Sequence, residues 1–220
     1  MELFIFKNVG LLPLIARYGL IVLVFCIFFF ATQKEKNYKR IIIGGVLFWI
    51  IYPAILSAMQ FFAWSQDPQT QILLTQPLAK ETPIPAIFHQ LLDREYGYYA
   101  FFVYGRFWLH SILLLLFVGI IGFLCKAIVR YRANILTDDE RMMMVVSALS
   151  LSWPSVVLFF PLVFIFLALH SVLQVFVLKG THTRMLPALC LALIVSLAFG
   201  HWLMPWANLQ VLVVSSQMNI

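Results

Sequence analysis

The placement of acidic residues constrains this 220-residue chain more than any other feature of its sequence. All nine of them, from Glu2 to Glu140, lie near the N-terminus or in short polar connections. The apolar runs between these connections contain neither Asp nor Glu, and at least four of the runs reach the ~20 residues that a helix needs to cross a ~30 Å hydrocarbon core. Charged residues make up only 11% of the chain, whereas a soluble domain contains about 25%. The sequence therefore predicts an all-α, polytopic membrane protein.

Polar connections separate five apolar segments, so we expect about five transmembrane helices in a single membrane domain that covers residues 1–220. Each segment has the length of one crossing, and a proline inside the second predicts a kink there. The spans are expected at about residues 14–31, 41–64, 100–125, 155–178 and 187–206.

Two of the connections carry further local signals. Residues 65–95 contain four prolines and many amides, a composition typical of an extended strap on the outer side of the membrane. Residues 137–153 begin with Thr137 and have Glu140 three positions later. This spacing predicts a capping box and therefore a helix start, which we expect on the cytoplasmic side.

Residues 145–178 are too long for one straight span and short for two. We expect a helix that bends at Pro154 and crosses the membrane once. The alternative is a hairpin that turns near Trp153-Pro154 or Phe160-Pro161, which would raise the number of spans to six. A turn there is disfavoured because it would expose unpaired backbone groups to lipid.

The distribution of Lys and Arg predicts the orientation of the spans. Residues 33–40 and residues 126–141 hold four each, whereas the longer segment 65–95 holds only two. We therefore expect both basic connections in the cytoplasm and the N-terminus outside, in a bacterial inner membrane. With five spans the C-terminus lies inside, but Lys179 and Arg184 then lie on the outer side, against the same rule.

The net charge of +6 does not indicate a nucleic-acid partner. The basic residues cluster beside apolar spans, where they act as topology determinants. We expect the lipid bilayer and other membrane protein subunits as partners, and no nucleic acid.

Two arginines inside predicted spans are expected to act as interfacial anchors. Arg17 lies near the outer end of the first span and Arg106 near the outer end of the third. No span contains an acidic residue, so the Arg106 guanidinium must extend to the interface or bond an acceptor outside the hydrocarbon. We expect an acidic side chain such as Asp93 or Glu95, a backbone carbonyl or a lipid phosphate. Contact with an anionic ligand is the functional alternative.

Two histidines are candidate axial ligands of haem b. His110 and His170 lie roughly 15 Å and roughly 12 Å below the predicted outer surface, at about 1.5 Å per residue. Two axial imidazoles need such a matching depth. In the alternative interpretation each ring bonds a backbone carbonyl, a Ser or a neighbouring helix, and no cofactor is bound.

Other cofactor and catalytic signatures are missing from the sequence. It contains no H-E-x-x-H motif for zinc, no G-x-S-x-G motif for a nucleophilic serine and no Gly-rich phosphate loop. We therefore predict no catalytic residue and no metal site. Closely spaced serines are expected to mediate helix contacts instead. They are Ser147, Ser150, Ser152 and Ser155.

These features favour a non-enzymatic integral subunit of a larger inner-membrane complex, of the secretion, transport or energy-transducing kind. The spans contain no catalytic constellation or acidic ion site, and the 65–95 segment is expected to lie over a partner. One alternative is a small b-type cytochrome or quinone-site subunit that uses His110 and His170. Another is a small channel or carrier, although these spans supply little polar lining for a permeation path.

Overall fold

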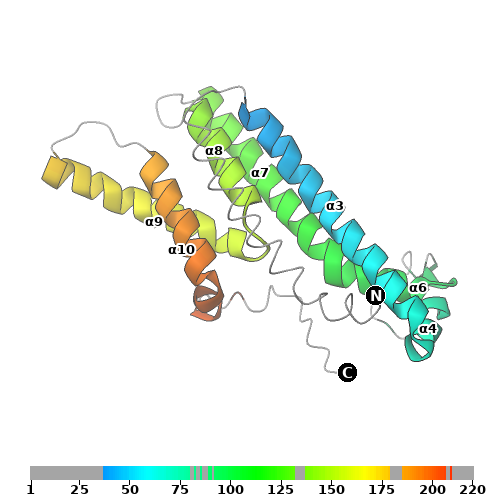
Figure 1. Ribbon diagram of the computed structural model, residues 1–220. Coiled ribbons are helices and arrows are strands. Elements are labelled where there is room, and N and C mark those ends of the chain that lie inside the picture. The colour runs from blue at the N-terminus through cyan, green and yellow to red at the C-terminus, as the bar shows by residue number, and fades with distance from the viewer. Residues whose placement is uncertain are drawn as a thin grey trace. The chain divides into compact units, whose positions relative to one another are not determined.

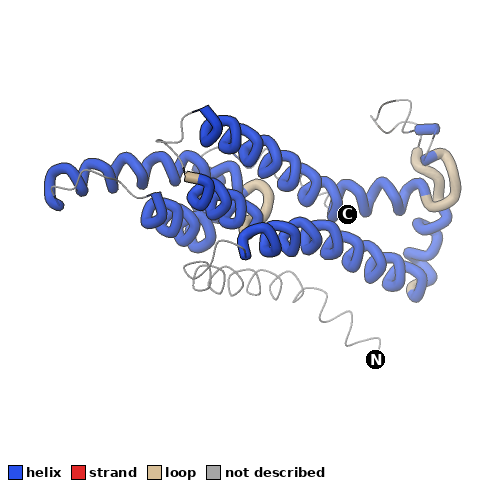
Figure 2. The backbone as a smooth tube through the Cα atoms, turned by 90° about the horizontal axis from the view of Figure 1, so that it is seen from above, coloured by secondary structure: helices blue, strands red, loops and turns tan. Residues whose placement is uncertain are grey.

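The computed structural model describes residues 37–79, 82, 85, 89–90, 92–131, 137–178, 185–206 and 209. The predicted span at residues 14–31, with Arg17, lies outside them. Helices and connecting loops make up the described part of the chain, as Figure 2 shows, so the expected all-α class is confirmed there. The chain divides into two compact units. The first contains Phe48–Ile112, and the second contains the described residues up to Leu47 and from Leu113 onward.

Three helices are long and apolar enough to cross a membrane, which is compatible with an integral membrane protein. They coincide with the second, third and fourth predicted spans. The second and third of these helices each include a short π-helical stretch that periodicity does not predict. The first helix is α3 (Asn37–Gln66), the second joins α6 (Gly97–Val103), η1 (Tyr104–Trp108) and α7 (Leu109–Tyr131), and the third joins α9 (Ser155–Leu173) and η2 (Gln174–Leu178).

α3 remains one helix although Pro53 lies inside it. Its charge-free stretch of residues 41–66 satisfies its backbone groups within the helix, as a segment in lipid must. Pro53 lacks the N–H that would bond the carbonyl one turn earlier. On the next turn, the Ser57 hydroxyl donates to the Pro53 carbonyl oxygen at 2.6 Å, so this polar side chain is satisfied inside an apolar helix.

The polar segment 65–95 contains a helix, so the expectation of an extended strap is wrong for this part. α4 (Pro68–Thr75) has Asp67 as its N-cap, and the Gln69 N–H donates to Asp67 Oδ1 at 3.1 Å. Pro68 occupies the first helical position, where a missing N–H leaves no helix bond unmade. Asp-Pro at this point is therefore a helix start.

The chain after α4 folds back on the start of α6. The Tyr98 N–H donates to the Gln76 carbonyl at 3.1 Å, and the Leu78 N–H donates to the Leu92 carbonyl at 3.2 Å. Gly97 permits this approach, because a Cβ at that position would collide with the Leu92 carbonyl. The connection between α3 and α6 is therefore a folded element of the first unit.

In the second unit, α8 (Asp138–Leu149) begins at the predicted capping box. The Glu140 N–H donates to Thr137 Oγ1 at 3.3 Å, and the Thr137 N–H donates to Glu140 Oε2 at 3.0 Å. The predicted helix extends to residue 153, whereas the observed one ends with Ser150 as its C-cap. Pro154 explains the early end, because proline disfavours helical backbone in the residue before it.

α8 runs antiparallel to α7, beside it in Figure 1. Near the start of α8, the Cys125 thiol of α7 lies 3.6 Å from Met144 Sδ. Just beyond the end of α8, the Trp153 ring centre lies 6.1 Å from that of Phe117. The later residue, Trp153, thus contacts the earlier position on α7, as expected for antiparallel helices.

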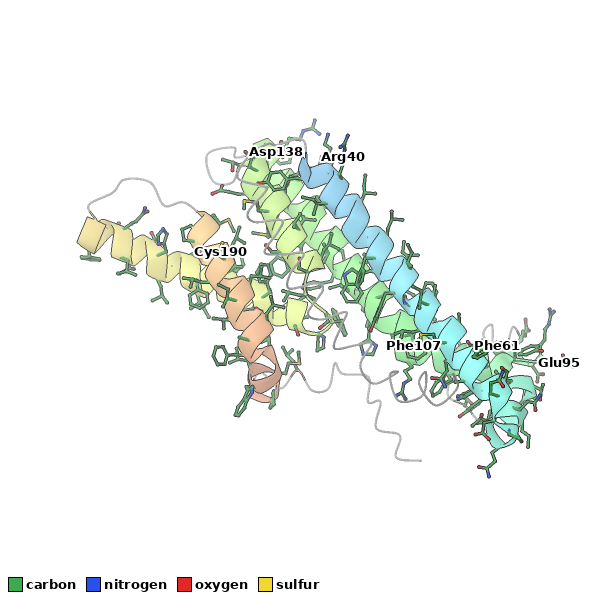
Figure 3. All side chains as sticks on the ribbon, viewed as in Figure 1. Arg40, Phe61, Glu95, Phe107, Asp138 and Cys190 are labelled. Atoms are coloured by element: carbon green, nitrogen blue, oxygen red, sulfur yellow. The ribbon has the colours of Figure 1, made fainter. Side chains whose placement is uncertain are left out.

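The start of α3 packs against α8. Tyr38 packs with Val146, and Ile42 packs against this pair. Arg40 and Asp138 accordingly lie at one end of the second unit in Figure 3. The basic first turn of α3 and the acidic start of α8 thus lie close together.

The turn between α8 and α9 is partly buried and hydrogen-bonded. The Leu151 N–H donates to the Ala148 carbonyl and the Val156 N–H to the Ser152 carbonyl, each at 3.2 Å. The Leu151 side chain has no exposed surface, whereas Ser152 is exposed. These bonds and this cover reduce the backbone that a turn here would leave unpaired in lipid, because irregular backbone is tolerated where protein covers it.

α10 (Met185–Trp206) begins beside the start of α8. The Met185 N–H donates to Glu140 Oε1 at 3.1 Å. Near its other end, Gly200 lies against Ser155 at the start of α9, so α9 and α10 pack antiparallel. A single crossing by α8 and α9 would place Met185 at the opposite end from Glu140. The observed contact favours the hairpin alternative.

One face of α10 consists of small buried residues at every fourth position. This face packs against neighbouring helices of the second unit, chiefly α9. Small side chains let helices approach closely where lipid removes the hydrophobic driving force. The residues are Ala188, Ala192, Ser196 and Gly200.

Candidate functional site

Arg106 lies in η1, on the surface of the first unit. Its guanidinium carbon lies 5.5 Å from the centre of the Phe102 ring, which is a cation–π contact. The predicted acidic partners are not in place, since no ion pair of the described residues joins Arg106 to Asp93 or Glu95. The exposed guanidinium thus contacts the Phe102 ring and makes no hydrogen bond to another described residue.

Aromatic rings gather around this guanidinium. Trp64 of α3 stacks on Tyr98 with ring centres 6.3 Å apart, and its ring centre lies 4.9 Å from that of Phe102. Tyr98, Phe102 and Arg106 are spaced by four residues and share one helix face. We call Trp64, Tyr98, Phe102 and Arg106 the Arg106 cluster.

His110 and His170 have different surroundings. The His110 ring lies near the backbone carbonyl of Arg106, one turn earlier on the same helix. His110 belongs to the first unit and His170, in α9, to the second, so the haem hypothesis stays a prediction. Arg17 lies outside the described residues.

Ser57 is the centre of a polar contact that sequence reasoning missed. The Tyr99 hydroxyl donates to the Ser57 carbonyl at 2.6 Å, and the Trp108 indole N–H donates to Ser57 Oγ at 3.1 Å. Two apolar helices are thereby joined by hydrogen bonds, which are favourable where no water competes. A lone Ser among apolar residues was the only signal available in the sequence.

Glu140 accepts hydrogen bonds from two helix starts at once. Its Oε2 accepts from the Thr137 N–H and hydroxyl, and its Oε1 accepts from the Met185 N–H. Both helices present the positive end of their dipole to this carboxylate. The sequence predicts the bonds to Thr137 but not the bond to α10, which depends on tertiary packing.

Potential metal ligands do not cluster in the described helices, where no group of three His, Cys, Asp or Glu side chains could hold an ion. Cys125 and Cys190 are free thiols on different helices. The hydroxyls of Ser147 and Ser196 are buried and have no hydrogen-bond partner within this part of the chain. The full burial of Ser147 fits the expectation that the serines pack at helix contacts.

The arrangement is suited to anchoring and recognition. The hydroxyl of Ser57 and the carboxylate of Glu140 already bond groups inside their own unit, whereas no described residue accepts a hydrogen bond from the exposed Arg106 guanidinium. Comparison with known protein families, with curated proteins and with solved structures gives no match for this chain.

Proposed function

We propose that this chain is a non-enzymatic integral subunit of a larger inner-membrane assembly, of the secretion, transport or energy-transducing kind. The supporting observation is that large apolar side chains at every fourth residue remain exposed along the long helices. Lipid covers such faces, and so do the spans of partner subunits. The exposed side chains are Ile43, Leu47, Ile51 and Ile55 on α3, Leu116, Ile120, Leu124 and Ile128 on α7, and Ile165, Leu169 and Leu173 on α9.

Exposed glycines on these faces favour a partner helix over lipid alone. Gly44 of α3 and Gly119 of α7 are exposed, and a Cβ at either position would meet no described atom within 4 Å. A glycine between large apolar residues forms a notch into which another helix can pack closely. These two notches have no occupant within the described chain.

The mass of the protein in mild detergent tests the proposal. We expect a species heavier than one chain, with a partner at fixed stoichiometry, measured by light scattering and native mass spectrometry. Gly119→Leu should reduce the partner-bound fraction because it fills the notch. Leu116→Met, on the same face with its volume kept, is the matched control. A wild-type protein that is a clean monomer without a partner would overturn the proposal.

We infer further that residues 137–178 form a hairpin in the membrane. Three observations support this arrangement: the partly buried turn after Ser150, the antiparallel packing of α9 and α10, and the bond from Met185 to Glu140. With the N-terminus outside, the chain then has six apolar segments and its C-terminus is also outside. Lys179 and Arg184 join the other basic connections in the cytoplasm, as the charge rule requires.

A small b-type cytochrome is the second candidate, and the surroundings of His110 are compatible with it. Metal-ligating histidines commonly donate one ring nitrogen to a carbonyl, which leaves the other directed at the metal. The Arg106 carbonyl lies near the His110 ring. Haem b bound by His110 and His170 would give a Soret band that shifts on reduction with dithionite, and His110→Ala would abolish it. Protein produced with ample haem and lacking the band would exclude this candidate.

A further inference from the structure

Arg106 lies one hydrocarbon thickness away from Lys126 on a single continuous helix. The 19 residues between them contain no Lys, Arg, Asp or Glu. Twenty steps of about 1.5 Å span roughly 30 Å, which is the thickness of a bilayer core. When Lys126 lies at one interface, Arg106 therefore lies at the other, at the level of the lipid phosphates.

The guanidinium at this depth has unused donors. Among the described residues, Arg106 contacts the Phe102 ring and makes no hydrogen bond, so no partner in this part of the chain takes its N–H groups. Asp93 and Glu95 are exposed and form no ion pair with it in the described part of the chain. An Arg at a membrane surface without a protein acceptor needs an acceptor from its surroundings.

The aromatic members of the Arg106 cluster define the same depth independently of the charge. Trp64 and Tyr98 stack at 6.3 Å, and their rings have the amphipathic character that places Trp and Tyr at the headgroup level. Tyr98 lies on the helix face that carries Arg106, and Trp64 of α3 contacts that face through Tyr98 and Phe102. Charge, depth and aromatic neighbours thus converge on one class of ligand.

We propose that the Arg106 cluster is a phospholipid site in which the Arg106 guanidinium binds the headgroup phosphate. The planar fork of Arg matches two phosphate oxygens with parallel N–H bonds. Trp64, Tyr98 and Phe102 pack beside the glycerol and upper acyl region. This site anchors the start of the third span in the outer interface, and it operates equally in a single chain or in an assembly.

Phospholipid retention tests the site. Protein reconstituted in vesicles of phosphatidylcholine and phosphatidylglycerol is extracted in mild detergent, and bound phospholipid per chain is measured by mass spectrometry. Arg106→Leu should retain roughly tenfold less at this site, as expected for loss of a charge-assisted bond. Arg106→Lys and Phe102→Leu should retain an amount of phospholipid between that of Arg106→Leu and that of the wild type. Arg94→Leu, an exposed arginine in the polar connection, is the control and should match wild type.

Two further measurements separate the remaining outcomes. A wash with inorganic phosphate should leave retention in the wild type unchanged, and displacement of the lipid would mean that the site takes free phosphate instead. A spin label on Gly105→Cys in a background without the natural cysteines reports depth with Arg106 intact, and Gly105 has room for it. The label should lie at the phosphate level. A position near the bilayer centre, or equal lipid retention in Arg106→Leu, would overturn the proposal.

Discussion

At the scale of the residue, Glu140 connects two parts of the chain that lie 45 positions apart. The local half of its role follows from the capping box, in which a carboxylate at the third helical position bonds the cap residue. The other half depends on the start of α10, whose Met185 N–H lies within 3.1 Å of Oε1. A carboxylate that faces two helix N-termini is stabilised by both dipoles, so it should contribute more than an ordinary cap.

Glu140→Ala is therefore expected to lower the free energy of unfolding by about 2–3 kcal/mol, since one cap and one charge-assisted interhelical bond are lost. Thermal unfolding in detergent followed by circular dichroism measures the change. Asp139→Ala is the matched control. It removes a neighbouring acid of the same helix turn that is exposed, and we expect an effect below about 1 kcal/mol. Equal effects of the two substitutions would show that the bond to α10 contributes nothing.

At the scale of the element, α10 shows how a helix in lipid obtains specific packing. Its small face, defined by Ala188, Ala192, Ser196 and Gly200, is buried, while Leu191 and Ile194 remain about half exposed at 49% and 52%. The two faces of α10 differ in the size of their side chains rather than in their polarity. Close backbone approach, rather than exclusion of water, therefore holds α10 in the second unit.

Ala192→Leu should disrupt this packing, because three added carbon atoms must fit where Ala192 has no exposed surface. Overpacking of this kind costs roughly 1–3 kcal/mol. Leu191→Met, one position away on the exposed face, should change stability by less than about 0.5 kcal/mol. The two variants are compared by thermal unfolding in the same detergent. If both behave like wild type, the small face is not a packed interface.

At the scale of the whole molecule, the proposed hairpin determines the expected sidedness of the connections. The bond between Met185 and Glu140 places the starts of α8 and α10 together. In the proposed arrangement, residues 126–141 and 179–184 lie on one side of the membrane, which removes the conflict that Lys179 and Arg184 raise with five spans. The proposal also assigns the C-terminal end of α10 to the outer side.

Reporter fusions measure this arrangement directly. An alkaline phosphatase domain fused after residue 206 should be active, because the enzyme folds only outside the cytoplasm, whereas a fusion after residue 137 should be inactive. A fusion at residue 82, in the connection between α4 and α6, is the positive control. Inactivity after residue 206 would contradict the hairpin, and activity after residue 137 would contradict the expected orientation of the whole chain.

The sequence by itself determined the features that depend on local composition. Runs without Asp or Glu required apolar helices, and the observed α3, α9 and the helix from α6 to α7 begin and end close to the predicted bounds. The spacing of Thr137 and Glu140 was enough for the cap, because its hydrogen bonds lie within one turn. The every-fourth-residue pattern of small residues in α10 is also visible in the sequence, because it depends only on residue type and spacing.

The tertiary structure decided what depends on contacts between distant residues. Whether residues 137–178 cross once or turn back could not be read from hydropathy, because both arrangements use the same apolar residues. The hairpin became acceptable only when packed side chains covered part of the turn and N–H groups bonded within it. Likewise, the acidic partners expected for Arg106 were chosen by proximity in sequence, whereas the folded chain sets the exposed guanidinium against Phe102. Local periodicity specifies each helix, but only packing specifies which ends meet.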